Sequence, residues 1–378
     1  MNKEQASFIN YFTEIRDPRI ANNNKRYELK EILLLVILAV ICGADSWTEI
    51  EAFGKSKVKF LRTLFPYKNG IPSHDTLGKL FSRLCPKEFQ RCFLNWINTL
   101  VKVQEGEIVA IDGKTLRRSH NKSDGKAAIH LVSAWASQNQ VVLGQYKTAD
   151  KSNEITAIPE LLKVLDLERC IVTIDAMGCQ RKIAEQIKRQ GAEYVLGVKA
   201  NQGQLHQKLT NLFAEAAKQS EQVMWYRTHE TVDGDHGRIE KRRTTVLPLM
   251  YLHSFKLKWN GLQSIVLIET ERKLGEEIRR EKRYYITSLE PNAEKIAAAI
   301  RQHWSIENQL HWTLDIAFRE DECRVRKGNA AENLAIVRRI ALNLLKAEKT
   351  AKVGIKIKRS KAGWDSQYLA KILNSSGF

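Results

Sequence analysis

The segment Ile108–Ser119, IVAIDGKTLRRS, begins with a short apolar run and continues with Asp112 and several basic residues. A second segment of this kind, Cys170–Gln180, reads CIVTIDAMGCQ and places Asp175 directly after its apolar run. Short β-branched runs of this length predict buried strands. If the two strands are parallel neighbours, both aspartates come to the same edge of one sheet. Taken singly, each aspartate is equally typical of a turn or a helix cap.

A third carboxylate, Glu307, lies in the helical stretch AAAIRQHWSIENQLHW (297–312). Trp304, Ile306, Leu310 and Trp312 flank it in the sequence, so we expect its face not to be fully exposed. A carboxylate kept at such a position favours a metal or cationic partner. Mg²⁺ prefers oxygen ligands, and two such ions about 3.5–4 Å apart can drive phosphoryl transfer. The three carboxylates therefore predict a site for two Mg²⁺ ions, with Mn²⁺ able to substitute.

Two histidines share the predicted helical face of Glu307. His303, Glu307 and His311 recur every four residues, which leaves a zinc site conceivable. Zinc sites normally draw on more than one element, and no HExxH pattern is present, so we expect both histidines to contact phosphate or to orient Glu307. Trp304 and Trp312 either pack nearby or stack on an extruded base.

The charge of the chain indicates a polyanionic partner. Its 378 residues include 61 Lys+Arg and 43 Asp+Glu, a formal net charge of +18, and the excess is spread along the sequence. An ordinary basic cytosolic protein is the alternative. Basic clusters beside a metal site suit phosphate contacts, although they are also typical of solvated loops. The residues expected to contact DNA are Lys114, Arg117, Arg118, Lys199, His236, Arg238, Arg242, Arg301, His303, His311, Arg324 and Arg326.

The six cysteines form no CxxC pair and lie mostly in apolar contexts, which is typical of reduced thiols in the cytoplasm. The N-terminus lacks the pattern of a signal peptide. The longest apolar run, Ile32–Ala44, is shorter than the roughly 20 residues of a membrane span, so it predicts a buried helix and no membrane partner.

The order of patterns predicts an α/β fold in several parts. Residues 1–100 read as a small all-helical N-terminal domain around Tyr27–Ala44, in which Ser73 or Asp75 caps a basic amphipathic helix. That arrangement is compatible with a helix-turn-helix, as is any three-helix domain. Residues 101–220 read as three strands followed by helix, strand, helix, strand and helix, the order of a ribonuclease-H-like core. A β-rich insertion at 221–290 interrupts this catalytic core, which resumes at 291–378 with the Glu307 helix and a basic tail.

These motifs carry a resemblance to a known family. The chain resembles bacterial insertion-sequence transposases of the DDE class, in the H-repeat-associated (ISAs-type) group. The similarity is nearly full length and includes AIDGKTLRRS, TIDAMGCQ, HGRIEKR and HWSIENQLHWTLDIAFREDECRVRKG. It implies that Asp112, Asp175 and Glu307 form a catalytic, metal-binding triad on a ribonuclease-H-like core interrupted by a β-rich insertion.

One signature of the wider family is missing. Around the catalytic glutamate its members often carry Tyr, Arg and Lys, where this chain has Ile300, His303 and Leu314. Arg301, Arg324 and Arg326 are candidates to replace the lost phosphate contacts.

The resemblance implies a DNA transposase that binds terminal inverted repeats, cleaves the element ends and performs strand transfer. It would act on double-stranded DNA as a homodimer or higher oligomer, in the bacterial cytoplasm at the nucleoid. The alternatives are a ribonuclease-H-like nuclease without strand transfer, and a catalytically lapsed DNA-binding remnant.

Overall fold

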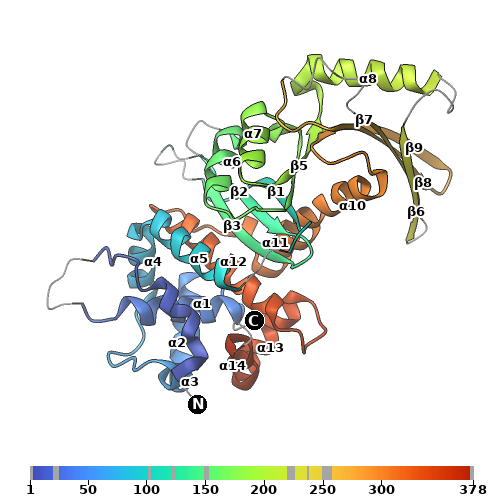
Figure 1. Cartoon of the computed structure of the whole chain (residues 1–378). Coiled ribbons are helices and arrows are strands. Elements are labelled where there is room, and N and C mark those ends of the chain that lie inside the picture. The colour runs from blue at the N-terminus through green and yellow to red at the C-terminus, as the bar shows by residue number, and fades with distance from the viewer. Residues whose placement is uncertain are drawn as a thin grey trace.

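The structure is a computed structural model that describes residues 3–19, 25–100, 104–120, 125, 127–148, 153–218, 226–235, 238–248 and 258–374. It has a mixed α/β architecture. One large sheet occupies the upper right of Figure 1, and a group of helices from both ends of the chain occupies the lower left. Within these described ranges, no helix is long and apolar enough to cross a membrane.

The N-terminal part is helical. Its elements are η1 (Lys3–Phe12), α1 (Leu29–Ile41), α2 (Trp47–Ser56), α3 (Val58–Leu64), α4 (His74–Arg83) and α5 (Pro86–Leu100). The predicted buried helix is confirmed, since every residue of α1 from Glu31 to Ile41 is buried. The predicted cap of α4 is confirmed at Ser73, whose hydroxyl accepts a hydrogen bond from the backbone N–H of Thr76.

In the part of the chain that the structure describes, the sheet contains nine strands. They are β1 (Ile108–Thr115), β2 (His130–Ala136), β3 (Val141–Lys147), β4 (Ile171–Ile174), β5 (Glu193–Val198), β6 (Arg227–Asp235), β7 (Arg238–Pro248), β8 (Ser264–Leu274) and β9 (Glu277–Thr287). Their spatial order is β3-β2-β1-β4-β5-β9-β8-β7-β6. β1, β4 and β5 run parallel, whereas all other neighbours are antiparallel.

The β-rich segment continues this sheet. β9 pairs with β5 from Val195↔Thr287 to Val198↔Tyr284, so β6–β9 extend the edge that β5 would otherwise expose. These four strands curve away from the body beside α8 (Gly203–Lys218) and α10 (Ala293–His303) (Figure 1). The remaining elements between β3 and β6 are α6 (Glu154–Lys163), η2 (Ala176–Gly178), α7 (Arg181–Arg189) and η3 (Ala200–Gln202).

The helical stretch around Glu307 is not one regular helix. After α10 comes η5 (Ile306–His311), a π-helical segment, and then α11 (Trp312–Phe318). The backbone N–H of Trp312 donates to the carbonyl of Glu307, five residues earlier, whereas bonds in an α-helix span four. The stretch is helical as predicted, but it contains a wide turn that the sequence did not indicate. Apolar spacing cannot reveal the extra residue, because a single wide turn barely changes the pattern.

The C-terminal helices join the sheet to the N-terminal helices. They follow η6 (Glu320–Glu322) and are α12 (Ala330–Ala347), α13 (Ile355–Trp364) and α14 (Ser366–Asn374). The α12 helix is buried along most of its length and packs on α1, α4, α5 and β3. Its Asn343 side chain accepts from the N–H of Val142 and donates to the carbonyl of the same residue, both at 3.0 Å. Amide bonding of this kind fixes α12 against β3.

Candidate active site

The two predicted aspartates lie side by side where β4 ends, but the prediction that Asp112 ends its strand is wrong, because β1 continues to Thr115 by pairing with β2. β1 and β4 are parallel neighbours in register up to Ile111↔Ile174, and the next residue on each is Asp112 and Asp175. Asp175 also begins the short turn η2, where its Oδ1 accepts from the N–H of Met177 at 2.9 Å. The proximity predicted from the apolar runs is thus confirmed.

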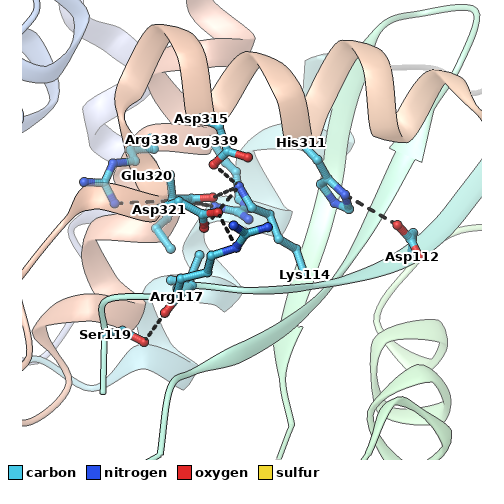
Figure 2. Close-up of polar contacts among 12 residues, drawn as sticks. Asp112, Lys114, Arg117, Ser119, His311, Asp315, Glu320, Asp321, Arg338 and Arg339 are labelled. Carbon is cyan, nitrogen blue, oxygen red and sulfur yellow. Dashed lines mark hydrogen bonds and ion pairs between the residues drawn. The ribbon is translucent and has the colours of Figure 1, made fainter. Parts of the chain in front are cut away.

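Glu307 reaches the same place from the π-helical segment η5. Ligand atoms of Asp112, Glu307 and His311 all lie within 4.8 Å of one another, a grouping suited to a metal ion. The Nδ1 atom of His311 is 3.4 Å from Oδ2 of Asp112 (Figure 2). Asp175 stands next to this group, and the three carboxylates line one cavity of about 480 Å³.

The aspartates are held in an environment that resists their ionisation. Burial, with the charge of Glu307 close by, raises the pKa of Asp112 to about 7. Burial also raises the pKa of Asp175, and Glu154 adds to the effect. Glu307 is exposed, against the expectation from its apolar neighbours, whereas the two aspartates are largely shielded from water. Their charges repel one another, and a cation between them removes that penalty. The electrostatics therefore favour cation binding.

The two histidines have different surroundings. Burial lowers the pKa of His303 to about 4 and that of His311 to about 3, so both are neutral at physiological pH. His303 Nδ1 lies 2.9 Å from the hydroxyl of Thr173 on β4. His311 instead joins Asp112 and Glu307. His303 therefore does not join Glu307 and His311 in one group, so the zinc site that the sequence left conceivable is not formed by these three residues.

A second cavity of about 610 Å³ adjoins the first. It lies between α10 and strands β6–β9, and the two cavities share Arg283, Tyr285, Ile300 and Trp304. The guanidinium of Arg283 stacks over the Trp304 ring, with 4.8 Å between its carbon and the ring centroid. Trp304 is therefore partly packed, while Trp312 is 62% exposed.

Several predicted DNA contacts lie on or near these cavities. Lys199 is exposed and lines the cavity of the carboxylates, and Arg242 and Arg301 line the adjoining one. Arg301 lies 3.6 Å from Asp233, which also contacts Arg242. The exposed Arg301–Asp233 pair is weak enough to be exchanged for a phosphate contact, whereas Arg242 is largely buried and also pairs with Glu240 at 2.6 Å.

The other predicted contacts are spread more widely. Arg117, Arg118 and Arg324 are exposed, and Arg326 donates to the backbone carbonyl of Arg118 at 3.0 Å. Lys114 is buried, contacts Asp315 and does not line the cavity. His236 lies outside the described residues, as does the side chain of Arg238.

A partly buried pair beside the aspartates, His130 and Glu154, was missed in the sequence. His130 Nε2 lies 2.8 Å from Glu154 Oε1, and Glu154 raises the pKa of both Asp112 and Asp175. Gly113 makes room for this pair, because a Cβ there would lie 2.1 Å from the Glu154 carboxylate. In the sequence, Glu154 looks like any acidic residue in the first turn of a helix, so nothing marked it.

The chain matches known protein families over most of its length. Residues 104–344 match the family described as "Transposase DDE domain", and residues 9–97 match the one described as "DDE_Tnp_1-associated". Both matches agree with the resemblance inferred from the motifs.

Relatives of similar length carry matching names. The chain is 43% identical to the "H repeat-associated putative transposase YhhI" of Escherichia coli (strain K12), over 93% of each chain. It is 42% identical to the "Putative transposase YncI" of Escherichia coli O157:H7, over 98% of this chain and 95% of that protein. A solved piggyBac transposase complex with hairpin DNA aligns with 97% of this chain and 78% of its own, at a TM-score of 0.43 and 11% identity. The chain therefore belongs to the DDE transposase family, among relatives that include H repeat-associated transposases, as its motifs predicted.

Proposed function

We propose that this chain binds the terminal inverted repeats of an insertion sequence, cleaves DNA at the element ends and joins the freed 3′-hydroxyl to target DNA. The observation that carries the proposal is that Asp112, Asp175 and Glu307 come from three different elements and line one cavity. Membership of the DDE transposase family supports a DNA-cleaving activity.

We further propose that β1–β5 and their helices form a ribonuclease-H-like core. The order β3-β2-β1-β4-β5, with an antiparallel β1–β3 part and parallel β4 and β5, supports this fold. We propose that the chain divides into a helical domain at 1–100, a core at 101–220 and 291–378, and an insertion at 221–290. We assign DNA docking to the first of these.

The three carboxylates suit Mg²⁺, with Mn²⁺ able to replace it. Oxygen ligands, close spacing around Asp112 and the raised pKa values of both aspartates fit a divalent cation. Two bound ions would activate the attacking oxygen and stabilise the leaving oxygen. Asp112 is held within β1, Asp175 directly after the end of β4 and Glu307 by the π-helical turn, and neutral His311 orients Asp112. No covalent intermediate on the protein is needed.

The exposed basic side chains supply phosphate contacts. Lys199 lines the cavity itself, and Arg301 lies in the adjoining one, so both are placed to hold a strand that enters the site. Arg117, Arg118 and Arg324 lie further out, and we assign DNA contacts to them, to Arg326 and Arg242, and to His236 and Arg238. An element has two ends, so we propose a homodimer or higher oligomer acting at the nucleoid.

The test is a cleavage and strand-transfer assay on DNA that carries the element's own ends. Each of Asp112→Ala, Asp175→Ala and Glu307→Ala should lower both activities by roughly 10³-fold or more, because metal ions supply several kcal/mol of transition-state stabilisation. Binding to the ends in the absence of metal should remain within a few-fold of wild type. Retained strand transfer in any of the three variants would overturn the proposal.

A second arm separates the alternatives. With pre-cleaved ends, a transposase joins the 3′-hydroxyl to target DNA, whereas a nuclease of the same fold only hydrolyses. Tight and specific end binding without any metal-dependent cleavage would instead indicate a lapsed remnant.

A further inference from the structure

The helical segment that follows Glu307 contacts β1 through two pairs of side chains, one after the other along the strand (Figure 2). Asp112 faces His311, and two residues further along the strand Lys114 contacts the carboxylate of Asp315, four residues further along the helix. Residues two apart share a strand face and residues four apart share a helix face, and the two spacings are about 6.7 and about 6 Å. The two residues on the strand and the two on the helix are therefore spaced by nearly the same distance, so both pairs can be in contact.

Lys114 belongs to a group of charged side chains that do not line the cavity. Its Nζ also lies 3.5 Å from Oε2 of Glu320 and 3.8 Å from Oδ1 of Asp321. Glu320 is fully buried and pairs with Arg339 at 2.9 Å. The ammonium group is thus surrounded by carboxylates from α11 and η6, and little of the Lys114 side chain is exposed to solvent.

The π-helical turn gives a reason why the Lys114–Asp315 contact is needed. An extra residue in one turn rotates everything after it relative to everything before it. On the near side of the turn, His303 is held against β4 by Thr173 at 2.9 Å. On the far side, Asp315 lies in the first turn of α11 and is held by Lys114. Glu307 lies between these two anchors.

We propose that Lys114 is a positioning residue: through Asp315 it fixes the rotation of α11 and η5, holds Glu307 and His311 beside Asp112, and thereby sets the affinity of the divalent-cation site. This role replaces the phosphate contact expected for Lys114 from its place after Asp112 in the sequence. The inference rests on the proposed function, because it assumes that the carboxylates bind a divalent cation.

The experiment measures Mn²⁺ binding to the full-length, DNA-free protein by electron paramagnetic resonance. Lys114→Met and Asp315→Asn should each raise the Mn²⁺ dissociation constant at least about tenfold, as the loss of groups that orient ligands commonly does. Their affinity for element-end DNA in the presence of EDTA should stay at the wild-type value. A phosphate-binding lysine predicts the reverse, weaker DNA binding with unchanged Mn²⁺ affinity.

Lys188→Met is the matched control. Lys188 forms a partly buried ion pair with Glu193 at 2.7 Å, which joins α7 to β5 away from the cavity. This variant should leave both affinities unchanged, so a general effect of losing an ion pair is separated from a specific one.

Unchanged Mn²⁺ affinity in the two variants would overturn the inference. If Lys114→Met does not fold, Asp315→Asn decides, because it keeps the size of the side chain and removes only charge. If the wild-type protein shows no Asp112-dependent Mn²⁺ binding, the proposed function fails together with this inference. If wild type and both variants bind Mn²⁺ equally, this inference alone fails.

Discussion

His311 lies with its Nδ1 atom 3.4 Å from Oδ2 of Asp112, so the helix that carries Glu307 touches the strand that carries the first aspartate. The two residues are 199 positions apart in the sequence, and the π-helical turn brings them together. The pKa of His311 is lowered by burial to about 3, which keeps the imidazole neutral. A neutral imidazole orients the carboxylate without competing with a cation for it.

This contact predicts a metal phenotype for His311. His311→Ala should raise the Mg²⁺ concentration needed for half-maximal end cleavage by about 10-fold to 100-fold, as is common when an orienting partner of a ligand is lost. His311→Asn should recover part of the loss, because its amide can stand near the position of Nδ1. An unchanged Mg²⁺ requirement in the alanine variant would contradict the assignment.

Lys199 should contribute to the salt dependence of DNA binding. Each phosphate contact to duplex DNA adds about 0.9 to the slope of log affinity against log salt, so Lys199→Ala should reduce the slope by about one. A salt titration of affinity for the element end measures it. Lys163→Ala is the control, because Lys163 lies on α6, pairs with Glu160 and lines neither cavity. Equal slopes for wild type and Lys199→Ala would remove this residue from the DNA contacts.

Glu348 predicts a specific acid sensitivity. Burial on its own would raise the pKa of Glu348, but hydrogen bonds from Thr350 and Tyr368 hold that pKa at about 2. A carboxyl with a lowered pKa in the folded state stabilises the protein above its unfolded value of about 4.3, and this contribution is lost as the pH falls towards 2.

The matching variant is Glu348→Gln. At pH 7 it should lose about 2–3 kcal/mol in free energy of unfolding, because hydrogen bonds to charged groups contribute about 1.5–3 kcal/mol. Between pH 4.5 and 2 its stability should change less with pH than that of wild type, approaching it at the acid end. Urea unfolding across this range is the measurement, and parallel curves for the two proteins would refute the role of Glu348.

Gly328 should be intolerant of any side chain. It has a φ of +54°, and a Cβ would lie 2.3 Å from the backbone carbonyl oxygen of Ser82, which also accepts from the N–H of Asn329. Gly328→Ala should therefore cost more than the roughly 1–2 kcal/mol of left-handed backbone strain alone. Gly203→Ala is the control. That position is helical with nothing within 4 Å, so thermal unfolding should show no loss of stability.

Local pattern predicted much of the fold because the relevant forces act over short stretches. The apolar runs before Asp112 and Asp175 are strands, the all-round apolar α1 is buried, and Ser73 caps α4. Parallel pairing of two such strands was enough to expect both aspartates at one edge. Each of these features depends on hydrophobic periodicity or on a cap a few residues away.

The features that the sequence did not reveal depend on distant partners. Lys114 follows Asp112 like a surface cation, yet its ammonium contacts Asp315, 201 residues away. Glu154 gives no signal in the sequence, although in the folded chain its charge raises the pKa of both Asp112 and Asp175. The wide turn at Glu307 likewise lies between contacts to distant strands, of His303 with Thr173 on β4 and of His311 with Asp112 on β1.

The sequence by itself determined the strands, the buried helices, the excess of basic charge and the family, because these follow from local composition and motifs. Only the tertiary structure decided which charges face the cavity and which are buried beneath it. The physical reason is that a charge removed from water needs a partner, and the chain supplies that partner from elements far apart in sequence.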